Sequence, residues 1–137
     1  MADNIRLEVV TPEKQVVNEM AQIVMAPGSM GEFGVLIGHT PFMTSLSTGA
    51  VHYRDEKGKD QYVFVSGGFA EALPDKVTVL AQSAEKSEEI DLERAKDAMA
   101  RAEKRLADRS SEDIDFVRAR AALERSLVRI KLSSGQI

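Results

Sequence analysis

Glycine and proline are confined almost entirely to the first part of the chain. All four prolines and eight of the nine glycines lie within residues 1–84. These residues interrupt helices and mark turns between short strands, whereas their absence permits long helices. The charge density changes at the same point, because residues 1–84 carry 16 charged side chains and residues 85–137 carry 24. The sequence therefore predicts two units of different class, residues 1–84 and residues 85–137.

The first unit is predicted to be all-β. Ile5, Leu7 and Val9 alternate with polar residues, which is typical of a strand with one buried face. Turn residues separate the β-rich runs, which suggests a sandwich or a flattened barrel. The further predicted strands are residues 22–26, 51–54, 61–66, 69–73 and 76–81.

The second unit is predicted to be an antiparallel α-helical hairpin. Apolar residues recur every three or four positions in two stretches, so each helix has one apolar stripe. Ser110 and the acidic residues that follow it predict the start of the second helix. The first stripe consists of Leu92, Ala95, Met99, Ala102 and Leu106, and the second of Phe116, Ala119, Leu123, Leu127 and Ile130.

Composition excludes several classes of function. The chain has no cysteine and two histidines, so it offers no thiolate metal site and no cysteine nucleophile. A net charge of -4 argues against a general nucleic-acid binder. Neither a secretory signal nor an apolar run long enough to span a membrane is present. We expect a protein without a metal or a membrane segment, and not a stand-alone enzyme.

Two loop residues of the first unit are candidates for a contact surface. Residues 28–34 are rich in glycine but are followed by strand-like residues, so turn glycines are favoured over a phosphate-binding loop. His39 has no second histidine or nucleophile nearby in the sequence, and Glu32 has no carboxylate partner for acid–base chemistry. Contact is therefore favoured over catalysis for both residues.

The helical unit carries arginines at regular spacing. Arg94 and Arg101 are seven residues apart, and Arg125 and Arg129 are four apart, so each pair lies along one side of a helix. Four guanidinium groups could clamp phosphates. From spacing alone, the favoured alternative is an N-cap at Asp91 and solvated, ion-paired arginines.

Three motifs together resemble the epsilon-subunit family of the bacterial F-type ATP synthase. They are GEFGVLIGHTPF (31–42), VSGGFAEALPDKVTVLAQSAE (65–85) and IDLERA (90–95), and the resemblance extends over essentially the full chain. It implies a β-sandwich of about ten strands that docks on the gamma subunit and on the ring of c subunits. It also implies contact roles for Glu32 and His39 at this rotor surface.

The same resemblance implies a regulatory, non-catalytic function. The protein is expected to be a central-stalk subunit that couples proton-driven rotation to ATP synthesis, on the cytoplasmic side of the bacterial plasma membrane. Its movable hairpin is expected to inhibit ATP hydrolysis by extending toward the alpha and beta subunits of the catalytic head. The resemblance also implies that no cofactor is required, that no nucleic acid is bound and that no segment enters the membrane.

ATP is the regulatory ligand that the resemblance implies for the folded hairpin. Some members of the family bind ATP through an I/L-D-x-x-R-A motif, which residues 90–95 match, together with further polar residues. The alternative is a free-standing nucleotide-sensing module that joins no assembly. The candidate ATP-binding residues are Glu85, Asp91, Arg94, Arg101, Arg125 and Arg129.

Overall fold

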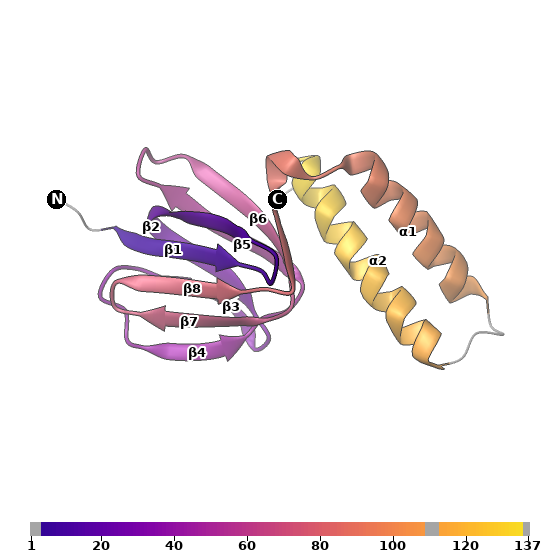
Figure 1. The fold of residues 1–137 in the computed structure, drawn as a ribbon, viewed down its shortest axis with the longest axis horizontal. Helices are drawn as coiled ribbons and strands as arrows, with labels where there is room; N and C mark the ends of the chain where they lie inside the picture. The colour runs from indigo at the N-terminus through magenta and orange to yellow at the C-terminus, as the bar shows by residue number, and fades with distance from the viewer. Residues whose placement is uncertain (1–3, 109–112, 136–137) are drawn as a thin grey trace. The chain divides into compact units, whose positions relative to one another are not determined.

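The expected β-sandwich followed by an α-helical hairpin is confirmed. The computed structural model describes residues 4–108 and 113–135. Within them it has nine strands, where the resemblance implied about ten, and two α-helices (Figure 1). The strands are β1 (Ile5–Val10), β2 (Gln15–Gly28), β3 (Gly31–Val35), β4 (Phe42–Ser45), β5 (Gly49–Asp55), β6 (Asp60–Ser66), β7 (Phe69–Leu73), β8 (Lys76–Leu80) and β9 (Ser83–Lys86), and the helices are α1 (Leu92–Ala107) and α2 (Asp113–Ser133).

The chain divides into two compact units, Met1–Ser87 and Glu88–Ile137. The division falls three residues beyond the predicted boundary, because β9 continues the sheet through Lys86 by pairing with β6. A short 3-10 helix, Ser87–Glu89, follows β9.

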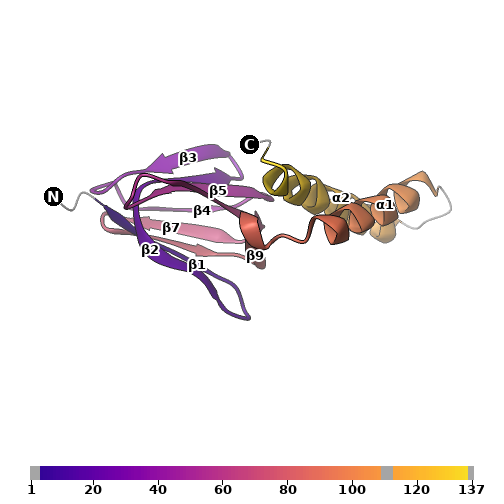
Figure 2. The same ribbon diagram turned by 90° about the horizontal axis from the view of Figure 1, so that it is seen from above.

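Strand β2 belongs to both layers of the sandwich. Its first half pairs with β1, and its second half pairs with β3 and β5. The register shifts between Ala21 and Ile23, where the two halves meet, and such a bulge bends a strand and increases its twist. The sheet order is β4-β7-β8-β1-β2-β5-β6-β9, with β3 also on β2. Figure 1 shows β1, β8, β7 and β4 side by side, and Figure 2 shows β3 and β5 on the other side of the core.

The core between the layers follows the predicted alternation. Ile5, Leu7 and Val9 are fully buried, as predicted for the inward face of β1. Tyr53 brings a polar group into this core, where its hydroxyl donates a hydrogen bond to a carboxylate oxygen of Glu19. A buried tyrosine hydroxyl usually has such a hydrogen-bond partner.

The β5–β6 turn is organised by one carboxylate. Asp55 Oδ1 accepts hydrogen bonds from the backbone amides of Lys57 and Lys59, each at 2.9 Å, and Oδ2 accepts one from Gln61 Nε2 at 3.1 Å. The amide of Lys59 is the largest influence on this carboxyl, and with the Gln61 bond it holds the pKa of Asp55 below its ordinary value. The turn is thus most stable with Asp55 ionised.

The glycine-rich segment is a β-hairpin. Gly28 pairs with Gly31 at the end of the β2–β3 ladder, so the expected turn is present. The sequence analysis did not predict strand β3, which follows this turn. A Cβ atom on Gly28 would lie 2.7 Å from the carbonyl oxygen of Gly31, which explains the glycine. Three glycines in seven residues conceal the alternation by which a strand is normally predicted.

Small side chains form the seam of the helical hairpin, in which α1 and α2 lie side by side (Figure 1). The buried residues Ala95 and Ala102 on α1 are seven apart, and so are Ala119 and Ser126 on α2. Seven-residue spacing is typical of packed helices, and small side chains permit close approach.

The predicted stripe on α2 is therefore only partly correct. Ala119 is buried, but Phe116 is 47% exposed and Leu127 is 42% exposed. Ser126, a polar residue absent from that stripe, is buried and donates a hydrogen bond to the carbonyl oxygen of Ala122 at 2.8 Å. This local bond offsets the desolvation cost of burying the hydroxyl in the seam. The residues of the seam can therefore not be predicted from their hydrophobicity alone.

Gly68 is the glycine that the sandwich can least replace. Its φ is +108°, and an added Cβ would lie 1.9 Å from the carbonyl oxygen of Leu80. Gly58 has a φ of +81°, and the nearest atom to an added Cβ would be Gln22 Nε2 at 4.0 Å, so Gly58→Ala measures the cost of the backbone conformation without a close contact. We predict that Gly58→Ala costs about 1–2 kcal/mol of unfolding free energy and that Gly68→Ala costs clearly more, measured by urea denaturation. Equal losses would contradict the role of the close contact.

Candidate functional site

The loop between β3 and β4 carries the first candidate site. The amide of Gly38 donates a hydrogen bond to the carbonyl oxygen of Pro74 at 2.6 Å, and the amide of His39 donates one to Leu36 at 3.1 Å. The first bond ties the loop to the β7–β8 turn, and the second closes a tight turn within the loop. Two segments distant in the sequence therefore hold the loop in one conformation.

The ring of His39 is fixed in this loop. Its Nδ1 atom lies 2.6 Å from the carbonyl oxygen of Thr40. Its ring centroid lies 5.0 Å from that of Phe42, which in turn packs edge-to-face on Phe33 at 5.0 Å. In the described part of the chain no group of three or more His, Cys, Asp or Glu side chains could hold a metal ion. The geometry therefore suits a positioned contact residue.

Glu32 lies in strand β3 and not in the loop that carries His39. It is the second residue of β3, pairs with Pro27 on β2 and is exposed. His39 follows the other end of that strand. Glu32 thus lies near the start of β3, and His39 lies in the loop that follows the strand.

Apolar side chains accompany His39. Leu36 is 55% exposed and Ile37 is 40% exposed in the same loop. The sequence analysis did not single them out, because apolar residues beside a strand resemble its buried continuation. Their exposure gives the loop the mixed character of a protein contact surface.

Asp91 begins the second candidate site as the N-cap of α1. Its Oδ1 atom accepts a hydrogen bond from the backbone amide of Arg94 at 3.1 Å. The capping alternative considered from the sequence is therefore confirmed. The bond leaves the guanidinium group of Arg94 unengaged by this carboxylate, and the motif positions both side chains at one end of the helix.

The candidate arginines lie on one face of the hairpin. Arg94 and Arg101 each precede a buried alanine of α1, and Arg125 precedes the buried Ser126 of α2. The two helices of an antiparallel pair are related by an approximate twofold axis that is perpendicular to the plane containing them. Rotation about this axis exchanges the two helices but leaves each face of the hairpin on the same side. Residues that precede the seam on either helix therefore share a face. Arg129, which precedes the half-buried Ile130, joins the same face.

Two further arginines extend this face. Arg105 precedes the half-buried Leu106, and Arg118 precedes the buried Ala119. They were missed because the sequence analysis tested spacing within each helix and not the position of each arginine relative to the seam. We call the six residues the arginine face, which consists of Arg94, Arg101, Arg105, Arg118, Arg125 and Arg129.

Three members of the arginine face lack an acidic partner in the part of the chain that the structure describes. Among the described residues, Arg94, Arg101 and Arg125 form no ion pair, so the predicted alternative of ion-paired arginines does not hold for these three. Unneutralised guanidinium groups on one face favour a bound polyanion.

Glu85, the remaining candidate, lies on β9 opposite Phe64 of β6. It belongs to the first unit, whereas the other candidate ATP-binding residues belong to the second.

Comparison with known proteins decides the family. Residues 4–87 match the family model "ATP synthase, Delta/Epsilon chain, beta-sandwich domain", and residues 88–134 match "ATP synthase, Delta/Epsilon chain, long alpha-helix domain". The chain belongs to the ATP synthase delta/epsilon family. The junction of the two matches coincides with the division into compact units.

Relatives of this family are similar over most of their length. The ATP synthase epsilon chain of Desulfosudis oleivorans is 66% identical over 106 residues, which cover 77% of this chain and 80% of that one. The epsilon chain of Geotalea uraniireducens is 46% identical over 134 residues, which cover 98% and 96%. As a member of this family the chain is a non-catalytic ATP synthase subunit, associated with the membrane as part of the complex.

Solved structures share the fold of this epsilon-type chain. A chain in the structure of Euglena gracilis mitochondrial ATP synthase, OSCP/F1/c-ring, matches with a TM-score of 0.80 at 24% identity and covers 100% of this chain and 83% of its own. A chain in the Tetrahymena thermophila mitochondrial ATP synthase central stalk/c-ring structure matches at 0.60 and 11% identity, covering 94% and 96%. No helix in the described residues is long and apolar enough to cross a membrane.

The role of Asp91 as a cap is separable from any role in binding. We predict that Asp91→Ala lowers the stability of the hairpin by about 1 kcal/mol, because the amide of Arg94 loses its acceptor. Asp91→Asn should retain most of that stability, since asparagine is also a good N-cap. Thermal unfolding followed by far-UV circular dichroism measures both, and equal losses would contradict the capping role.

Proposed function

We propose that the chain is a rotor subunit of the central stalk of F-type ATP synthase, in which the sandwich docks and the hairpin regulates. The sandwich would bind the gamma subunit and the c ring through the loop of His39 and through Glu32 on β3. This arrangement couples proton-driven rotation to ATP synthesis on the cytoplasmic side of the bacterial plasma membrane. The family membership supports the proposal, and so does the tertiary fixing of the His39 loop.

The observation that carries the regulatory part is the division of the chain into two compact units. The hairpin has its own seam of small residues and its own capped start, so it can keep its structure while its position changes. We infer that it inhibits ATP hydrolysis when it extends toward the alpha and beta subunits. Its arginine face would then meet acidic surfaces of the catalytic head.

Removal of the hairpin tests inhibition. An ATP synthase complex assembled with a chain that ends at Ser87 should hydrolyse ATP faster than the complex with the full chain. Both complexes are compared at equal content of this subunit, so that a failure of assembly is distinguished from a change in activity. Unchanged hydrolysis in a fully assembled complex would refute the inhibitory role.

We further propose that the arginine face binds the phosphates of ATP in the folded hairpin. A ligand shifts a conformational equilibrium only by its difference in affinity for the two states. At a concentration 100 times its dissociation constant, ATP would stabilise the binding state by about 2.7 kcal/mol. ATP would therefore shift the population away from the extended, inhibitory state.

Paired substitutions test the ATP site. Arg94→Ala with Arg125→Ala removes two cations that precede the seam, and calorimetric titration of the full chain with ATP should then show no saturable binding. Lys96→Ala with Arg120→Ala is the matched control, because these residues follow the buried Ala95 and Ala119 and lie on the opposite face. Equal loss of binding in both double variants, or no binding by the unmodified chain at millimolar ATP, would contradict the site.

A further inference from the structure

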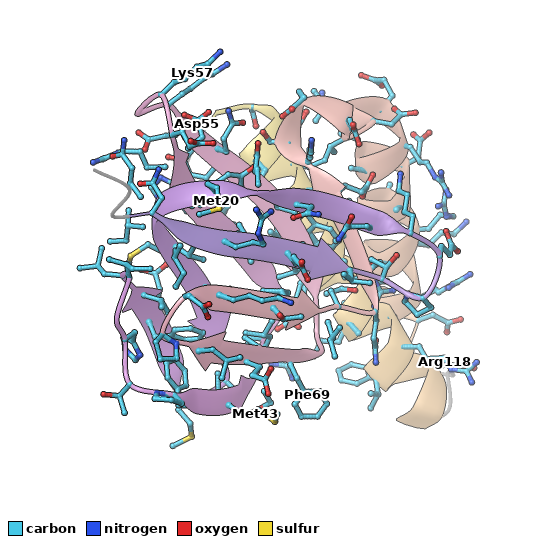
Figure 3. All side chains as sticks on the ribbon, turned by 60° about the vertical axis from the view of Figure 1, so that its left-hand side comes forward. Met20, Met43, Asp55, Lys57, Phe69 and Arg118 are labelled. Carbon is cyan, nitrogen blue, oxygen red and sulfur yellow. The ribbon has the colours of Figure 1, made fainter. Side chains whose placement is uncertain are left out.

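The side of α2 that lies across the seam from the arginine face is exposed. Arg118, a member of the arginine face, precedes the buried Ala119, whereas Arg120 follows it. Leu127 follows the buried Ser126 in the same way. Arg118 projects outward from its helix in Figure 3. Arg120 and Leu127 therefore belong to a second surface of α2, distinct from the arginine face.

Four side chains make up this second surface. Val117 is 66% exposed and Leu127 is 42% exposed, and Arg120 and Glu124 are exposed between them. Because each residue of an α-helix turns the chain by about 100°, the four positions lie within about 80° of one another around the helix axis. We call this surface the α2 flank, which consists of Val117, Arg120, Glu124 and Leu127.

The first half of α2 carries a hollow on this side. It has a volume of about 250 Å³ and is lined by Phe116, Val117, Arg120, Ala121 and Glu124. Four of these residues, at positions i, i+3, i+4 and i+7, have the spacing of the four residues that receive a side chain of a facing helix in coiled-coil packing. A second helix is therefore a partner of the right shape.

The two charges of the α2 flank specify the chemistry of the partner. Arg120 and Glu124 are four residues apart, yet within residues 4–108 and 113–135 neither forms an ion pair. A partner surface of one sign would leave one of these charges unpaired in the contact, which is costly. An anionic lipid surface has this defect, because it would meet Glu124. The partner must present both a carboxylate and a cation.

The α2 flank itself has the required arrangement. Arg120 and Glu124 each lie two residues from position 122, and Val117 and Leu127 each lie five residues from it. In a twofold contact, residue i of one copy meets residue j of the other, and j meets i. An antiparallel helix pair with its axis at position 122 therefore forms two Arg120–Glu124 ion pairs and two Val117–Leu127 contacts. A parallel pair would instead place like charges together.

We propose that two copies of the free chain associate through the α2 flank, in an antiparallel twofold contact centred on position 122. The midpoint of α2 (Asp113–Ser133) is residue 123, so the two helices overlap along nearly their whole length. The arginine face lies across the seam and stays open to a ligand. Four residues a side are far fewer than the roughly 20 of a standard interface, so the dimer is weak and depends on concentration. This inference does not depend on the proposed rotor function.

Sedimentation velocity of the full chain, from micromolar to millimolar concentration, tests the contact. The unmodified chain should shift toward a dimer as its concentration rises. Arg120→Glu and Glu124→Arg should each weaken association by at least about tenfold, because each places like charges opposite one another. Lys104→Glu is the matched control for Arg120→Glu, because it makes the same change of charge at an exposed position of α1. It should associate as the unmodified chain does.

Exchange of the two charges makes the test specific to this pairing. An equal mixture of Arg120→Glu chains and Glu124→Arg chains should dimerise again, because every contact between positions 120 and 124 then joins opposite charges. A chain that carries both substitutions should also recover self-association, for the same reason. Misfolding cannot explain a loss that a second substitution restores. If neither the mixture nor the double variant recovers, the inference is wrong.

Introduced cysteines report the orientation of the pair, since the chain has none of its own. Under mild oxidation, a mixture of Val117→Cys and Leu127→Cys chains should form a disulfide-linked dimer. Neither variant alone should do so, because antiparallel pairing brings position 117 to position 127 and keeps the two copies of either position apart. Efficient cross-linking of each variant with itself would indicate a parallel pair and overturn the inference.

Other occupants of the α2 flank have their own signatures, and each would overturn the inference. An unmodified chain that stays monomeric at millimolar concentration, and whose binding to ATP synthase depleted of this subunit is weakened by Arg120→Glu, would assign the flank to another subunit. Binding to vesicles of phosphatidylcholine and phosphatidylglycerol that Arg120→Glu weakens and Glu124→Arg strengthens would assign it to lipid. A dimer that every flank variant leaves intact would use a different surface.

Discussion

The sandwich depends on the continuity of β2. This single strand of 14 residues supplies hydrogen-bond partners to β1 in one layer and to β3 and β5 in the other. The irregularity between Ala21 and Ile23 lets the strand bend without ending, so that the inward side chains of both layers meet in one core. The positions of the β2–β3 hairpin and of the His39 loop follow from this bend.

The helical unit packs in a different way from the sandwich. Two helices share a narrow seam, and here the seam is made of small residues at seven-residue spacing, which lets the backbones approach. The same spacing places arginines beside the seam on both helices. The seven-residue repeat therefore determines both how the helices pack and which face of the hairpin is positively charged. The arginine face therefore persists as long as the hairpin does.

The outer faces of the sandwich carry the side chains that the core leaves outside. Strand alternation puts Ala70 and Ala72 inside and leaves Phe69 and Leu73 outside, although the outer pair is more apolar. Hydrophobicity alone would orient β7 the other way round. The space between the two layers decides the orientation, since alanine fits where phenylalanine would overpack the core.

Sequence alone determined the two-unit organisation, the strands with clear alternation, the two helices and the cap at Asp91, because each follows from local spacing and turn chemistry. It did not determine β3, β4 or β9, since glycines or a short length conceal their periodicity. Only the tertiary structure showed that the His39 loop is tied to the β7–β8 turn, that the seam takes Ser126 in place of Phe116, and that six arginines share one face. These facts depend on how distant segments pair across a ladder or a helix seam, and such pairing leaves no periodic signal within either segment.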